Sequence, residues 1–156
     1  MAIQKVREYF KEFGIDNRIQ EFEVSSATVE LAALALGCEG CRIAKSLSFK
    51  VGDRPILVVA AGDAKVDNHK YKEQFSQKAK MLSLDECEQL IGHAVGGVCP
   101  FAVNDGVDVY LDKSLKRFET VFPACGSSNS AIELTITELE GYSNYKAWVD
   151  VCKGWE

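Results

Sequence analysis

The feature that most limits the fold is a pair of strand-like segments in the first half of the chain, residues 42–50 and 55–61. Segment 55–61 is the longest apolar stretch, and it has the length of one strand. Gly52 and Asp53 supply turn residues between the two segments. We therefore expect a β-sheet that contains both strands.

Helical patterns mix irregularly with further strand-like segments. Residues 2–13 place apolar side chains at three- and four-residue intervals, which predicts an amphipathic helix. Capping signals predict three more helices: 29–36 after Thr28, 68–77 after Asp67, and 84–92 after the capping box Ser83-Glu86. Strand-like composition marks residues 19–24, 80–82, 107–111, 120–125, 131–136 and 148–152. Because strict βαβ alternation is missing, we expect the α/β (α+β) class, with a mixed sheet and helices packed outside it.

Length and composition indicate an ordinary globular protein. The chain has 156 residues, a formal net charge of -5 and a hydrophobic fraction of 47%. Such an acidic chain is a poor candidate for coating nucleic acid non-specifically, since that binding depends on many basic contacts to phosphate. The N-terminus lacks the apolar core of a signal peptide, and no apolar run has the length of a membrane span. We therefore expect a cytoplasmic protein without membrane association, whose six cysteines are reduced.

Lys45 is the residue that fits a passive core least well. In the expected strand it shares a face with Ile43 and Leu47, since alternate side chains of a strand point to opposite sides. A buried ammonium without a partner is costly. Lys45 therefore extends to an edge, pairs with a buried carboxylate, or faces a pocket where a ligand oxygen completes its environment. The strand alone leaves these alternatives open.

Two loops are rich in main-chain donors. Segment 92–100 contains three glycines, and adjacent amides in such a turn can converge on an oxygen, as in an oxyanion hole. A tight connection between a helix and a strand has the same composition. The segment lacks the ending of a P-loop and the spacing of a dinucleotide fingerprint. The second loop, 126–130, carries small polar side chains that suit either a ligand's polar groups or an ordinary hairpin turn.

The cysteines suggest two further sites. Cys38 and Cys41 have metal or redox spacing, but no second CxxC or matching histidine pair completes a four-ligand zinc site. We therefore expect a helix-end turn and no metal. Cys99 or Cys125 with His93 would form a thiol nucleophile only if the fold brought them together, which the sequence does not decide.

Four motifs occur in a specific order and spacing: Thr28-Val29-Glu30, Ile43-Ala44-Lys45-Ser46-Leu47, Gly96-Gly97-Val98-Cys99-Pro100-Phe101 and Gly126-Ser127-Ser128-Asn129-Ser130. In this order they resemble the YbaK and prolyl-tRNA-synthetase-associated editing family of aminoacyl-tRNA deacylases, over nearly the whole chain. The resemblance implies one domain, residues 1–156, with a mixed sheet curled into a partly closed barrel. It also implies hydrolysis of the ester joining a small non-cognate amino acid to tRNA, usually tRNA(Pro), without metal or organic cofactor.

The resemblance also assigns roles to individual residues. It makes Lys45 the main functional side chain, and it brings the main chain of Gly96 and Gly97 to the scissile ester. Substrate contacts are expected from the other motif residues: Thr28, Ser46, Pro100, Gly126, Ser127, Ser128 and Asn129. The implied partners are the acceptor end of mischarged tRNA and an associated aminoacyl-tRNA synthetase. Some relatives place a histidine near the later loops, whereas this chain has only His69 and His93, so a histidine general base is not expected.

The expected mechanism needs few side chains, because an aminoacyl ester is already activated. The amides of Gly96 and Gly97 would bracket the carbonyl or the attacking water. Lys45 would hold a phosphate or ester oxygen, and we expect it to stay charged beside phosphate. The competing hypothesis is a non-catalytic module that binds an amino acid or the tRNA acceptor end in the same pocket.

Overall fold

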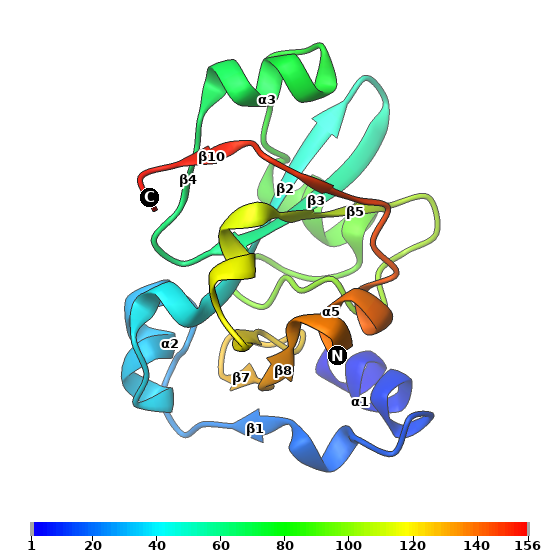
Figure 1. The fold of residues 1–156 in the computed structure, drawn as a ribbon. Helices are drawn as coiled ribbons and strands as arrows, with labels where there is room; N and C mark the ends of the chain where they lie inside the picture. The colour runs from blue at the N-terminus through cyan, green and yellow to red at the C-terminus, as the bar shows by residue number, and fades with distance from the viewer. Residues whose placement is uncertain (1, 156) are drawn as a thin grey trace.

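A computed structural model describes residues 2–155, whose arrangement is shown in Figure 1. Within this range a mixed sheet of six strands has the order β8-β6-β2-β3-β5-β9 and curls into a half-barrel. Its strands are β2 (Ile43–Val51), β3 (Arg54–Ala61), β5 (Asp108–Asp112), β6 (Thr120–Pro123), β8 (Leu134–Thr135) and β9 (Ala147–Val149). The pairs β2–β3 and β6–β8 are antiparallel, and β2–β6, β3–β5 and β5–β9 are parallel. The expected mixed sheet, curled into a partly closed barrel, is confirmed.

Two short antiparallel pairs tie distant segments together. β1 (Gln20–Glu21) pairs with β7 (Ser130–Ala131), and β4 (Lys65–Val66) pairs with β10 (Cys152–Lys153). The first pair joins the segment before Thr28 to the end of loop 126–130. Two segments that the sequence assigned to the site are therefore linked through the backbone.

The helices are α1 (Ala2–Lys11), α2 (Val29–Leu36), α3 (Asn68–Phe75), α4 (Leu84–Glu86) and α5 (Ile136–Ser143). Short turns of 3-10 helix are η1 (Asp16–Arg18), η2 (Gly40–Arg42) and η4 (Lys113–Arg117), and η3 (Cys87–Ile91) is a π-helical turn. In Figure 1, α3 lies at one end of the molecule and α1 and α5 lie near the other. None of the helices within residues 2–155 is long and apolar enough to span a membrane.

Local capping chemistry explains the bounds of α2. The Thr28 hydroxyl accepts a hydrogen bond from the Leu31 amide at 3.1 Å, which satisfies one of the free donors of the first turn. Gly37 ends the helix in the left-handed conformation, with φ of 68°. The predicted capping box of Ser83 is also present and opens α4. Here the sequence prediction is confirmed.

Several predicted elements differ from the observed ones because pairing partners lie far away in the chain. Expected strand 131–136 is divided, since Ala131 pairs with β1 while Leu134 pairs with β6. Expected strand 148–152 is likewise divided between β9 and β10, and strand 19–24 shrinks to β1. Residues 80–82 form only a single bridge, between Met81 and Phe49. The helix expected over 84–92 changes to a π-helical turn after α4.

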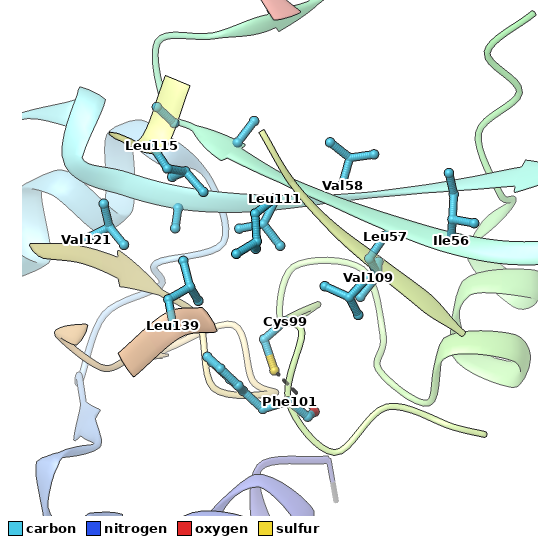
Figure 2. Packing of buried hydrophobic residues seen from close by; sticks show 14 of the residues in the cluster. Ile56, Leu57, Val58, Cys99, Phe101, Val109, Leu111, Leu115, Val121 and Leu139 are labelled. Atoms are coloured by element: carbon cyan, nitrogen blue, oxygen red, sulfur yellow. Dashed lines mark hydrogen bonds between the residues drawn. The ribbon is translucent and has the colours of Figure 1, made fainter. Parts of the chain in front are cut away.

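The core lies around β3 and extends to residues 92–100, called the glycine loop below. Every residue of β3 from Ile56 onward is at most 1% exposed. Figure 2 shows Val109 and Leu111 of β5 in the same cluster as Cys99 and Phe101, which follow Gly96 and Gly97. Cys99 and Phe101 are both fully buried. The loop is therefore anchored in the core immediately after its two adjacent glycines.

Candidate functional site

A cavity of about 440 Å³ brings together four of the residues predicted for the site. Thr28, Lys45, Ser46 and Gly96 all line it, although they come from three separate segments of the chain. Most of the remaining wall is apolar, with side chains from α2, β2, β6 and the segment between α3 and α4. A second cavity of about 500 Å³ lies on another side of α2, and none of the predicted site residues line it. We therefore take the first cavity as the candidate site.

The Lys45 ammonium is held inside the protein by main-chain oxygens. Nζ donates to the carbonyl of Gly62 at 3.4 Å and to that of Ala64. The side chain is half-buried, and burial lowers the pKa of its ammonium. Lys45 lines the cavity, while its ammonium meets carbonyl oxygens of residues outside the lining. The ammonium is therefore paired neither with a buried carboxylate nor with solvent alone.

The turn that supplies these carbonyls depends on a close backbone approach. A Cβ added at Gly62 would lie 2.0 Å from the Gly40 carbonyl oxygen, so no other residue fits there. The main chains of η2 and of residues 62–64 therefore lie in direct contact. This contact fixes the carbonyls that orient Lys45.

The two hydroxyl groups on the cavity wall have different environments. Thr28 uses its hydroxyl to cap α2, so its main observed role is to start that helix. The Ser46 side-chain oxygen is buried and has no hydrogen-bond partner within residues 2–155. A buried hydroxyl without a partner is uncommon and calls for an explanation.

Gly96 and Gly97 have different surroundings in the glycine loop. Gly96 lines the cavity with φ of 101°, which favours glycine, and its ideal Cβ would contact Ala27 at 3.5 Å. Gly97 is buried outside the cavity lining, and its amide donates to the Ala94 carbonyl at 3.1 Å. In this structure the Gly97 amide closes the turn, so the expectation that both amides bracket a substrate oxygen stays a prediction.

Ser130 is the residue of loop 126–130 that lines the cavity among the described residues. Ser127, Ser128, Asn129, Gly126 and Pro100 are absent from its lining among the described residues. The Ser128 carbonyl accepts from the Ser26 amide at 2.6 Å, and Asn129 Nδ2 donates to the carbonyl of Phe22 at 2.9 Å. These bonds fix the segment before Thr28. Direct substrate contact by this loop stays a prediction.

The fold does bring a thiol and an imidazole together, but in the core. Cys99 Sγ lies 3.5 Å from His93 Nε2, which also contacts the carbonyl of Phe101 at 2.7 Å. Both residues are fully buried, and burial raises the pKa of Cys99 to about 12 while it lowers the pKa of His93. Burial also raises the pKa of Cys125 well above its usual value. A buried thiol that stays protonated is a poor nucleophile, so this pair does not fit a thiol hydrolase.

Cys38 and Cys41 also lack the surroundings of a metal or redox centre. Burial raises the pKa of both thiols, and the Cys41 thiol lies 3.6 Å from a carboxylate oxygen of Glu39. Within residues 2–155 no group of three or more histidine, cysteine or acidic side chains is gathered to hold a metal ion.

Sequence reasoning missed most of the cavity wall. Ile43 and Leu47 are the members that strand alternation relates directly to Lys45. Met81, Leu84 and Val95 line the cavity although they are 61%, 70% and 57% exposed. Exposed large apolar side chains beside a cavity are typical of a binding rim. Their grouping arises from tertiary packing, so no local sequence signal indicates it.

The comparisons with known proteins agree on one family. The sequence model of the aminoacyl-tRNA editing domain matches residues 23–142. YwhH of Bacillus subtilis (strain 168), described as uncharacterized, is 57% identical, and the match covers 100% of both chains. Proline--tRNA ligase of Geobacillus sp. (strain WCH70) is 31% identical over 65% of this chain, and the match covers only 18% of the ligase's own length. A solved structure described as a proposed trans-editing enzyme for prolyl tRNA synthetase has a TM-score of 0.87 and 26% identity, covering 98% of both chains. The chain therefore belongs to the aminoacyl-tRNA editing domain family.

Proposed function

We propose that this protein is a trans-acting hydrolase that cleaves the ester of a mischarged tRNA, with tRNA(Pro) carrying a small non-cognate amino acid as its substrate. The observation that carries the proposal is the shared cavity of Lys45, Ser46 and Gly96, which joins a cation to a main-chain turn. Membership of the editing family and the likeness to a proposed trans-editing enzyme support it. We propose further that residues 1–156 work as one domain in the cytoplasm and that the tRNA acceptor end enters this cavity.

The chemistry requires charge stabilisation more than proton transfer. Water attacks the ester carbonyl, and negative charge develops on the carbonyl oxygen. The bond from the acyl carbon to the ribose oxygen then breaks, and the proton lost by the water passes to that ribose oxygen, so the products are the free amino acid and the uncharged tRNA. Gly96 lines the cavity, and in this scheme its amide donates to the carbonyl oxygen; such preorganised donors contribute about 3–4 kcal/mol each. The Gly97 amide has no part in this scheme, since Ala94 occupies it.

Lys45 acts as a cation in this scheme. Its ammonium would donate to the carbonyls of Gly62 and Ala64, and a phosphate or ester oxygen would replace these weaker acceptors when tRNA binds. Desolvation, which lowers its pKa, also strengthens its attraction for an anion. We therefore assign Lys45 to binding and charge stabilisation.

Single-turnover deacylation of tRNA(Pro) charged with different small amino acids tests the proposal. Lys45→Ala should slow the reaction more than about a hundredfold, as expected for loss of a contact worth roughly 3 kcal/mol in the transition state. Lys50→Ala is the matched control, because Lys50 lies on the same strand outside the cavity and pairs with Glu86. It should change the rate less than about twofold.

The outcome also separates the enzyme from a non-catalytic binding module. A binding module would lengthen the lifetime of the ester compared with buffer alone, whereas a deacylase shortens it. If Lys45→Ala remains folded and within about twofold of the parent rate, the assignment of Lys45 fails. If the parent protein protects every ester tested, the proposed activity itself fails.

A further inference from the structure

Four serines line the cavity, and three of their hydroxyl groups are engaged within the protein: those of Ser26, Ser48 and Ser130. The Ser26 hydroxyl donates to the Ser128 carbonyl at 3.3 Å. The hydroxyls of Ser130 and Ser127 lie 2.7 Å apart, and Ser48 interacts with the Cys87 thiol. Ser46 alone of the four has a side-chain oxygen without a partner among the described residues.

The backbone at Ser46 is also open toward the cavity. The ladder between β2 and β6 stops at Ala44, and the next contact along this edge joins the Ser48 carbonyl to the Leu82 amide at 3.2 Å. Main-chain groups of alternate residues in an antiparallel strand point to the same edge. The amide and carbonyl of Ser46 therefore fall in the gap between these two contacts. A ligand that enters the gap meets polar groups of one residue.

The walls on either side of this gap favour a small and mostly apolar group. Aliphatic and aromatic side chains such as Val29, Leu47 and Phe122 surround it, and no carboxylate from residues 2–155 lines the cavity. A purely aliphatic side chain would leave the Ser46 hydroxyl unpaired. A side chain with one hydroxyl would satisfy it after a rotation of Ser46 between staggered rotamers.

We propose that Ser46 selects an aminoacyl group whose small side chain bears a hydroxyl, as in serine and threonine. This inference rests on the proposed deacylase function and names its substrate class. The hydroxyl of the substrate and that of Ser46 form one hydrogen bond inside the cavity. A site built to bond a hydroxyl disfavours the analogue that lacks it, because its own polar group then stays unpaired.

Threonine and valine provide the sharpest test, since their side chains have nearly the same shape and differ by one hydroxyl. The same tRNA(Pro) is charged with threonine, valine or alanine, and single-turnover rates are measured for the parent and for Ser46→Ala. The parent should cleave the threonyl ester about tenfold faster than the valyl ester. Ser46→Ala should bring this ratio near one by slowing the threonyl reaction while the valyl rate changes little.

Ser48→Ala is the matched control, because Ser48 lies on the same face of β2 and its hydroxyl already has a partner. It should keep the threonyl-to-valyl ratio of the parent. A parent that cleaves both esters equally, or a Ser46→Ala variant that slows both by the same factor, overturns the hydroxyl preference and leaves deacylation standing. Cleavage of the alanyl ester alone also overturns it. A parent that cleaves none of the esters overturns the proposed function instead.

Discussion

Replacing Gly97 by alanine should destabilise the protein by about 2–3 kcal/mol, the upper part of the range for overpacking a buried site. The new Cβ would lie 2.6 Å from the Ser127 nitrogen and 2.7 Å from the Gly126 carbonyl carbon. Both are main-chain atoms, so no rotation of a side chain can relieve the clash. The glycine loop and loop 126–130 would have to move apart, against the anchoring of Cys99 in the core.

Urea unfolding of Gly97→Ala and Gly141→Ala checks this calculation. Gly141 lies in α5, and its ideal Cβ would meet nothing within 4 Å. The same substitution should therefore stabilise the protein there by about 0.5–1 kcal/mol, since alanine favours a helix over glycine. Deacylation by Gly97→Ala should also fall, because the displaced loop carries Gly96. A Gly97→Ala variant within about 0.5 kcal/mol of the parent would show that the two loops are not packed in this way.

Two further predictions concern buried titratable side chains. Burial lowers the pKa of His93 in the folded protein. As the pH falls below about 6.5, the unfolded chain therefore takes up a proton at this histidine before the folded protein does. The free energy of unfolding should then drop by up to about 1.4 kcal/mol per pH unit. Urea unfolding between about pH 7 and 5 should show this slope in the parent and in His69→Gln, and the slope should become smaller in His93→Gln. An equal slope in His93→Gln would contradict the role of His93. Asp112 is fully buried, and its carboxylate accepts from the amides of Ser114 and Val151, each at 3.0 Å. Asp112→Ala should therefore cost roughly 2–5 kcal/mol in urea unfolding, whereas Asp105→Ala in an exposed loop should cost little; similar values for both would refute the role of these bonds.

The sequence predicted best what depends on neighbouring residues. Thr28 and Gly37 bound α2 as expected, because both caps are contacts within the first or last helical turn. The two central strands were also predicted, since apolar composition and turn residues coincide there. The division of residues 131–136 between two partners was missed, because strand pairing depends on residues far away in the chain.

The candidate site was predictable only in part, for the same physical reason. The place of Lys45 on an apolar face left three alternatives open, and its contacts with Gly62 and Ala64 come from a turn that follows β3. Lys45 also lines the cavity, which the strand pattern alone did not decide. Nothing in a Gly-Gly pair shows which amide faces a ligand. Only the fold shows that Gly97 closes the turn while Gly96 lines the cavity.

The burial of Cys99 and Phe101 has a consequence for how a substrate reaches the site. A segment whose side chains lie fully in the core opens only when much of the domain unfolds, so its amides should exchange slowly with solvent. The end of the glycine loop should therefore keep its conformation when a substrate binds. Any opening of the cavity is therefore expected at its exposed lining residues Met81, Leu84 and Val95, and not at Cys99 or Phe101.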